Sequence, residues 1–235
     1  MRVFLFQSNT SNKHFSMNLS NRLTKICQTI TPNVFDHIWD CCCDHGYLGQ
    51  QLMIEHPDSQ IHFVDVVPHL ISQVQQRLNN QPFNNWTVHC IDTATIDLVE
   101  NKSHLVIIAG VGGDLLIEMV ADIASKHKDV KNSTRLDFIL CPVRQLHKVR
   151  NGLNSLNLGL VSEQIVEDNN LFYEVIQVSN QATQTLSLVG ESMWDTSNLR
   201  HLAYRNTMIA HYEKQPNDDA KRLLSLYQEI KPTQW

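Results

Sequence analysis

Short apolar runs alternate with stretches of helical periodicity along most of the chain. Runs rich in Val, Ile, Leu and Phe that end in polar turns predict buried strands. The first run centres on Ile38 and Trp39, and later runs occupy residues 60–65, 86–91, 104–109 and 136–142. Apolar residues three and four positions apart precede the first run and follow several others, which predicts helices between the strands. This order predicts a doubly wound α/β fold with a mostly parallel sheet.

The end of the predicted sheet has a different pattern. Two strands, 158–166 and 171–178, are separated by the short polar segment 167–170, which predicts an antiparallel hairpin. A parallel sheet that finishes in a hairpin is the arrangement of the Rossmann-like class I methyltransferase fold. A dehydrogenase more often continues with further crossovers. We therefore expect the methyltransferase arrangement.

Beyond residue 180 the composition changes. Residues 181–196 are rich in Ser, Thr and Gln and predict a linker, and two apolar stripes predict a pair of helices near 199–212 and 220–230. This small helical appendage either grips an RNA, mediates dimers or covers a sheet edge. The predicted organisation is a poorly specified extension at 1–16, a cofactor-binding domain at 17–180, and a linker with a helical hairpin at 181–235. Met17 is a candidate start of the folded part.

Composition is that of a globular protein with one main domain. The 235 residues are 42% hydrophobic, and no apolar run approaches the roughly 20 residues that span a bilayer. The apolar start is too short for a signal peptide, so we expect a cytoplasmic protein with no membrane partner. The net charge of −5 excludes a uniformly basic nucleic-acid coat protein. Two basic clusters, at 126–135 and 144–150, are either phosphate-binding patches or solvated helix faces.

The six cysteines do not form a metal motif. No pair has C-x-x-C spacing, and the adjacent Cys41, Cys42 and Cys43 point alternately to opposite faces of a strand end. We expect reduced, mostly buried thiols and no metal.

The candidate ligand site begins at the turn after the first strand. This turn carries Asp40 and Asp44, ends in Gly46, and is followed by a helix, and nucleotide-like ligands bind at that place in doubly wound folds. Two carboxylates argue against a phosphate ligand, which glycines and a lysine would cradle. They suit a ligand with a cationic amine and ribose hydroxyls, and S-adenosylmethionine has both.

Polar residues after the next strands extend this site. Asp65 ends the second strand at the offset of a carboxylate that accepts hydrogen bonds from ribose hydroxyls. Asp92, with Thr93, follows the third strand and either meets an adenine amino group or caps a turn. The sequence Gly-Val-Gly-Gly at 110–113 follows the central strand, and glycines there let the backbone approach something flat.

Four segments together resemble the bacterial tRNA (adenine-22-N1)-methyltransferase family. They are D-x-x-x-D-H-G-Y-L at 40–48, I-A-G-V-G-G at 108–113, F-I-L-C-P at 138–142 and E-D-N-N-L-F-Y-E-V at 167–175. The resemblance covers about residues 18–180. It implies a class I methyltransferase fold, S-adenosylmethionine as methyl donor, and N1 of adenine 22 in the tRNA D-loop as target.

The chain departs from that family at three places. It has Cys42 where the family usually has glycine, Cys141-Pro142-Val143 where the family usually has Q-P-N, and Val111 where the family usually has methionine. These departures indicate a divergent branch. They leave open methylation of another RNA position or of a small molecule, and a non-catalytic RNA-binding protein with the same fold. A nucleotide-dependent oxidoreductase is disfavoured because the first turn is acidic and no G-x-G-x-x-G is present.

The expected roles follow from methyl transfer to a ring nitrogen. Asp44 is the catalytic candidate, because a carboxylate stabilises the cationic product or holds the cofactor amine. The residues assigned to the cofactor are Asp40, Cys42, Asp44, His45, Gly46, Asp65, Val66, Asp92, Thr93 and Gly110. Those assigned to the substrate are Arg22, Tyr47, Gly112, Gly113, Pro142 and Arg144. Arg22 and the basic clusters would hold phosphates of a tRNA partner, and we expect a monomer or weak homodimer.

Overall fold

A computed structural model of the chain describes residues 18–32, 34–127 and 135–230. The predictions for the extension at 1–16, for Met17, and for Lys128 and Lys131 of the first basic cluster lie outside the described residues.

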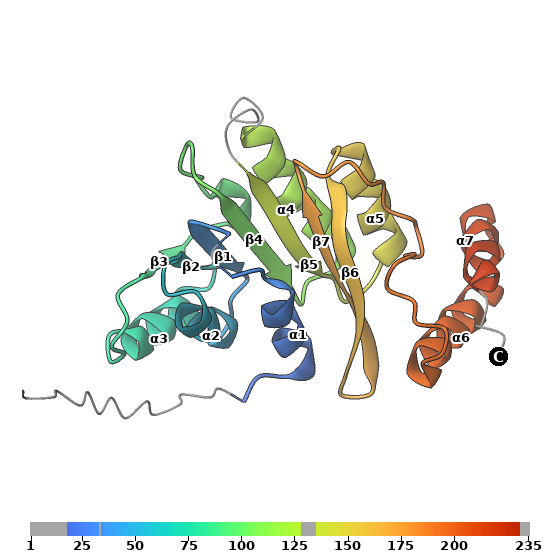
Figure 1. Cartoon of the computed structure of the whole chain (residues 1–235), viewed down its shortest axis with the longest axis horizontal. Helices are drawn as coiled ribbons and strands as arrows, with labels where there is room; N and C mark the ends of the chain where they lie inside the picture. Colours follow the sequence, from blue (N-terminus) through green and yellow to red (C-terminus); the bar gives the residue numbers. More distant parts are fainter. Residues whose placement is uncertain (1–17, 33, 128–134, 231–235) are drawn as a thin grey trace, which may run out of the picture.

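The described chain forms one seven-stranded sheet in the order β3-β2-β1-β4-β5-β7-β6 (Figure 1). The strands are β1 (His37–Cys41), β2 (Gln60–Asp65), β3 (Trp86–Cys90), β4 (His104–Ala109), β5 (Leu136–Cys141), β6 (Gly159–Asp168) and β7 (Leu171–Ser179). The first five run parallel, and β7 pairs antiparallel with both β5 and β6. The predicted Rossmann-like sheet ending in an antiparallel hairpin is therefore confirmed.

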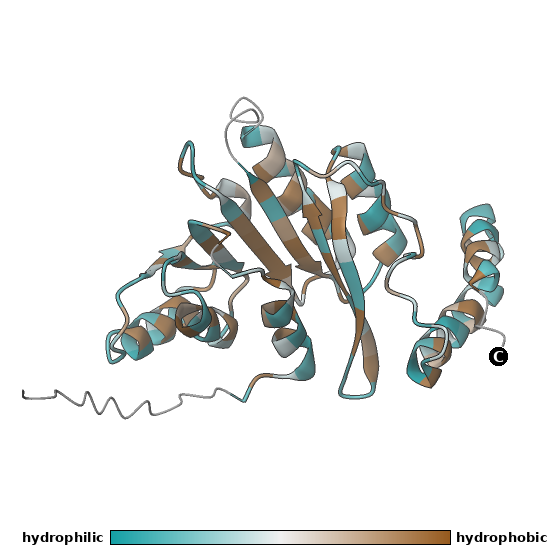
Figure 2. Cartoon of the chain, in the orientation of Figure 1, coloured by the Kyte–Doolittle hydropathy of each residue, from teal (hydrophilic) through white to brown (hydrophobic). Residues whose placement is uncertain are grey.

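Five helices cover the two faces of this sheet, and two more follow at the C-terminal end of the described chain. The helices are α1 (Asn21–Thr29), α2 (Tyr47–Glu55), α3 (Pro68–Leu78), α4 (Gly113–Lys126), α5 (Leu146–Ser155), α6 (Leu199–Glu213) and α7 (Asp218–Glu229), with a 3₁₀ turn η1 (Thr93–Thr95). One apolar core joins α1, α2 and α3 to the sheet, and a second joins α4 and α5 to its other face. Figure 2 shows the apolar central strands between helices with polar outer faces. α5 was not predicted from the periodicity.

The hairpin turn is tighter than predicted. β6 extends to Asp168, so that only Asn169 and Asn170 connect the strands, and both have positive φ (51° and 61°). Two left-handed residues match the twist of a two-residue hairpin, and asparagine tolerates that conformation. The structure thus replaces the expected four-residue turn with a two-residue one.

The C-terminal segment begins with an irregular stretch that packs on the core. Residues 181–196 contain no helix or strand, as expected of a linker, but Leu186, Val189 and Met193 are buried. α6 and α7 follow and share a small core that includes Tyr212, Leu223 and Tyr227. In the part of the chain that the structure describes, no helix combines the length and apolar character that crossing a bilayer requires.

Candidate functional site

A cavity of about 300 Å³ opens at the carboxyl ends of β1 and β4. These strands are neighbours in the sheet, and the chain order reverses between them. Ligands of doubly wound folds bind at such a switch point. The lining residues are Arg22, Leu23, Asp40, Cys41, Cys42, Cys43, Asp44, His45, Tyr47, Leu48, Ala109, Gly110 and Val111.

The loop after β1 forms one wall of the cavity in a constrained conformation. Cys42 and Asp44 have positive φ (55° and 49°), and Gly46 has φ of 67°. The carboxylate of Asp65 fixes this loop, because it accepts hydrogen bonds from the amides of Asp44 (3.1 Å) and Val67 (3.0 Å). Asp65 lies behind the loop and does not line the cavity. Its contact with ribose stays a prediction.

Asp40 is the buried acid of the site. Its Oδ2 accepts a hydrogen bond from the Gly49 amide at 2.9 Å, which ties the end of β1 to the first turns of α2. The pKa of the Asp40 carboxyl is raised to about 7, because burial and, to a smaller extent, the charge of Asp65 outweigh the hydrogen bond from the Gly49 amide. The site therefore holds a carboxyl that gains or loses its proton near neutral pH.

The mouth of the cavity carries exposed polar and aromatic groups. The Asp44 carboxylate lies 3.7 Å from the His45 ring, and both side chains are largely accessible. The guanidinium of Arg77 lies over the Tyr47 ring, 4.9 Å from its centre, and donates a hydrogen bond to the His45 carbonyl at 2.7 Å. Arg77 was not predicted, since it lies on α3 with no motif around it. The structure thus gives Tyr47 a cationic partner on one face.

Arg22 brings a positive charge into the cavity from α1. Its guanidinium lies over the ring of Tyr173, 5.0 Å from the centre, and beside Gly110. Among the described residues, its Nε is the one buried side-chain nitrogen or oxygen without a hydrogen-bond partner. A buried donor of this kind is costly unless a ligand satisfies it. Sequence reasoning found Arg22 but placed it on RNA phosphates, and it missed Tyr173.

Of the predicted glycine floor, only Gly110 lines the cavity, at φ of 83°. Gly112 and Gly113 lie beneath the segment after β5. A Cβ atom on Gly113 would be 2.7 Å from the Arg144 carbonyl, and one on Gly112 would be 3.1 Å from Arg144 Nε. These two glycines therefore allow the loops after β4 and β5 to pack closely. Neither glycine lines the cavity, and Pro142 does not line it either.

The remaining predicted residues lie at the neighbouring strand ends. Asp92 caps η1 by accepting a hydrogen bond from the Ala94 amide at 3.0 Å, which is the capping alternative. Thr93 is buried and Val66 is exposed, and none of the three lines the cavity. Their contacts with a cofactor stay predictions. Arg144 lines a second cleft, described below.

The cysteines are all free thiols, and Cys42 is the partly exposed one in the loop. Burial raises the pKa of the Cys42 thiol, which keeps it protonated and uncharged at neutral pH. In the described parts of the chain, no three His, Cys, Asp or Glu side chains converge as metal ligands would.

Comparisons with known proteins agree with this geometry. Residues 19–176 match the family described as Methyltransferase domain. A Mycoplasma pneumoniae protein named "Putative tRNA methyltransferase" is 22% identical over 197 residues, which cover 83% of this chain and 87% of that protein.

Two solved structures share the fold of the chain. M. capricolum TrmK in complex with S-adenosyl-homocysteine has a TM-score of 0.69 at 16% identity, covering 90% of this chain and 96% of that one. The B. subtilis M1A22 tRNA methyltransferase TrmK has a TM-score of 0.67 at 20% identity, with coverage of 91% and 96%.

Proposed function

The chain belongs to the methyltransferase-domain family, and from that premise we propose that it transfers a methyl group from S-adenosylmethionine to N1 of an adenine in tRNA. Adenine 22 of the D-loop is the proposed position, since the B. subtilis structure is that of an M1A22 tRNA methyltransferase. The cavity between the ends of β1 and β4 is the observation that carries the proposal. The proposed place of action is the cytoplasm.

The charged groups of the cavity fit the methionine part of the cofactor. Asp40 would hold its amine, and the unpaired Nε of Arg22 would donate to its carboxylate. Arg22 is better placed for that carboxylate than for an RNA phosphate on the open surface. When bound, S-adenosylmethionine supplies an electrophilic methyl group on a sulfonium.

The chain's own part in the reaction is to position and to stabilise charge. Adenine N1 has a free lone pair at neutral pH, so no general base has to act before the attack. Transfer leaves a positive charge on the adenine, and the accessible Asp44 carboxylate at the cavity mouth would stabilise it. The loop is fixed by Asp65, which keeps Asp44 in place without reorganisation.

The base must leave its stack to reach the cavity. Gly110 and Val111 would form one side of the space that receives it, and the Tyr47 ring at the mouth would form the other. Arg77 holds that ring from behind. An aromatic face and a glycine backbone together suit a flat purine.

The proposal is tested with labelled S-adenosylmethionine and tRNA transcripts that lack modifications. We expect N1-methyladenosine after digestion, and loss of the signal when adenine 22 is replaced by guanine. Incorporation at another nucleoside would keep the methyltransferase and move the target. Measurable binding of S-adenosyl-homocysteine with no incorporation into any RNA would exclude the tRNA activity.

Asp44→Asn tests the catalytic residue. Asparagine tolerates a left-handed backbone, so the loop should keep its shape. We expect kcat to fall by about 100-fold or more, as for removal of one charge-stabilising group. Asp58→Asn is the control, because Asp58 is an exposed aspartate that does not line the cavity. Near-normal turnover by Asp44→Asn would remove Asp44 from the mechanism.

A further inference from the structure

A second and larger cleft, of about 550 Å³, lies beside the C-terminal helices. Its walls are the turn between β5 and α5, the tip of the β6–β7 hairpin, and one face of α6. The lining residues are Val143, Arg144, Gln145, Leu146, His147, Asn170, Leu171, Phe172, Tyr204, Thr207, Met208, His211, Tyr212 and Gln215. The proposed methyl transfer uses none of this volume.

The lining combines aromatic rings with basic groups and contains no aspartate or glutamate. Phe172 is a partly buried aromatic residue of the lining, and its ring is stacked on Tyr204 with 5.1 Å between ring centres. The guanidinium of Arg200 lies over the same ring at 5.3 Å, but Arg200 is outside the lining and its charge is paired with Glu167. Arg144 stands at the edge of the cleft as an exposed cation. This chemistry complements a flat ring that carries a negative charge nearby.

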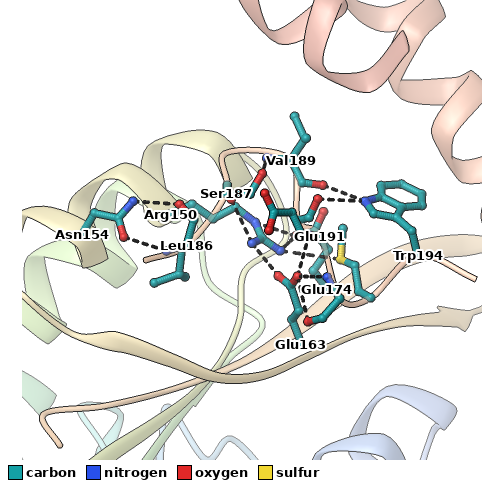
Figure 3. A network of polar contacts seen from close by, with 12 residues as sticks. Arg150, Asn154, Glu163, Glu174, Leu186, Ser187, Val189, Glu191 and Trp194 are labelled. Atoms are coloured by element: carbon teal, nitrogen blue, oxygen red, sulfur yellow. Dashed lines mark hydrogen bonds and ion pairs between the residues drawn. The ribbon is translucent and has the colours of Figure 1, made fainter. Parts of the chain in front are cut away.

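Buried polar contacts hold the α6 wall in place. The Tyr204 hydroxyl donates to Glu174 at 2.9 Å, and the Tyr212 hydroxyl is 3.2 Å from His147 Nδ1. The chain that leads into α6 is fixed by a buried cluster around Arg150, which bonds Glu163 at 2.7 Å and Glu174 at 2.6 Å (Figure 3). The cleft is therefore formed before any ligand binds.

The cleft adjoins the cofactor cavity. Val143, in its lining, donates a backbone hydrogen bond of 3.0 Å to the carbonyl of Val111, which lines the cavity. Both hollows thus open at the carboxyl edge of the sheet, at the ends of the neighbouring strands β4 and β5.

We propose that this cleft binds a nucleobase of the RNA substrate that flanks the methylated adenine in the folded RNA. The inference rests on the proposed function, because it places a second part of the same substrate. A base turned out of its stack leaves neighbours unstacked, and aromatic side chains bind such bases by their faces. The accessible part of the Phe172 ring would contact the base, and Arg144 would supply a charge for the adjoining phosphate.

Negative charge placed in the cleft tests the proposal. Thr207→Glu and His211→Glu each add a carboxylate at an exposed position of α6 in the lining. Ala210→Glu is the matched control, since Ala210 is exposed on the same helix but outside the lining. We expect both cleft variants to bind unmodified tRNA transcript at least 10-fold more weakly, with the control unchanged. All three should bind S-adenosyl-homocysteine as the natural chain does.

A crosslinking experiment tests whether a base, and not only a phosphate, occupies the cleft. A transcript carrying 5-iodouridine is irradiated with the protein, and the crosslinked peptides are sequenced. We expect a crosslink to Phe172 that Thr207→Glu removes. Crosslinks confined to peptides outside the lining would overturn the proposal.

The outcomes separate this inference from the proposed function. If the natural chain methylates tRNA and both cleft variants bind it with unchanged affinity, the inference fails and the function stands. If the natural chain neither binds nor methylates tRNA, the proposed function fails first. If the cleft variants change the molar mass in light scattering but not RNA affinity, a second copy of the chain occupies the cleft, and the RNA proposal is wrong.

Discussion

Asp40 couples cofactor binding to pH at the scale of a single residue. Burial at the end of β1 raises its pKa from 3.8 to about 7, so the free protein carries the carboxyl partly protonated at neutral pH. A cationic amine bound beside it favours the carboxylate and lowers that pKa. We therefore expect S-adenosyl-homocysteine to bind more tightly as pH rises from about 6 to about 8, with proton release near neutrality.

Calorimetry in two buffers of different ionisation enthalpy measures that proton release. Asp40→Asn keeps a side-chain oxygen for the Gly49 amide, so the variant should fold. It should bind more weakly at high pH and lose most of the pH dependence. Equal proton release by the variant and the natural chain would assign the titration to another group.

Residue types in the sequence indicated several residues that line the cavity, whereas the conformation of the loop and its long-range contacts are visible only in the structure. The acids of the first turn were found because their residue types and order are informative. The family's glycine at the position of Cys42 has its physical reason in a left-handed backbone there, at φ of 55°, which glycine adopts without steric cost. Neither the ring of Tyr173 over Arg22 nor the bond from Asp65 to the loop can be read from spacing, because each joins distant segments.

At the scale of elements, four strands bring histidines together on one face of the sheet. His62 Nδ1 lies 3.0 Å from His89 Nε2, and its own Nε2 lies 3.0 Å from His37 Nδ1. Trp39 stacks on His62 at 3.8 Å and donates a hydrogen bond to His104 at 3.1 Å. The chain between β3 and β4 contains only the short η1, so these rings take the place of a covering helix in the part of the chain described.

This cluster should make the fold sensitive to acid. Burial, together with the neighbouring histidines, lowers the pKa of His62 to about 3 and that of His104 to about 4. In the unfolded chain these histidines have a pKa near the unperturbed value of about 6.5. Below that pH the unfolded chain binds protons that the native state does not, so the free energy of unfolding falls. Each histidine contributes about 1.4 kcal/mol per pH unit between its two pKa values.

Urea unfolding at several pH values measures the effect. Asp40 works in the opposite direction, since its raised pKa favours the native state as pH falls. The natural chain is therefore compared with His62→Gln, whose stability should fall less steeply between about pH 6 and about pH 4. His69→Gln, at an exposed position on α3, serves as control. Parallel curves for His62→Gln and the natural chain would contradict the argument.

The local sequence pattern predicted helices and strands correctly where the buried positions are all apolar. Strands buried on both faces, such as β4, are continuous apolar runs and were predicted with their bounds. α5 was missed because its buried positions include Arg150, which a hydropathy pattern reads as a surface residue. Only the structure shows that two carboxylates neutralise this arginine inside the core.

Long-range packing decides how the C-terminal third joins the whole molecule. Residues 181–196 have the composition of a linker, yet Ser187 accepts a hydrogen bond from Arg150 at 3.1 Å. The amides of Glu191 and Ser192 donate to Glu163 at 2.7 and 2.8 Å. These partners lie 28 or more residues apart in sequence, so no local pattern predicts them. These buried hydrogen bonds attach the segment that leads into α6 to the sheet.

The attachment predicts that the sheet and the C-terminal helices unfold together. The fully buried side chain of Glu174 on β7 forms an ion pair with Arg150 of α5 and accepts a hydrogen bond from Tyr204 of α6. Glu174→Gln leaves the arginine with one carboxylate and removes the charge from the hydrogen bonds that Arg150 and Tyr204 donate to residue 174, and a hydrogen bond to a charged group contributes about 1.5–3 kcal/mol. We expect a single thermal transition at a clearly lower midpoint, with faster hydrogen exchange in α6. Lys221→Gln, which removes an exposed ion pair on α7, should leave the midpoint nearly unchanged. Two separate transitions in the natural chain would mean that the helices are a unit of their own, and the cleft beside α6 would then not be a rigid one.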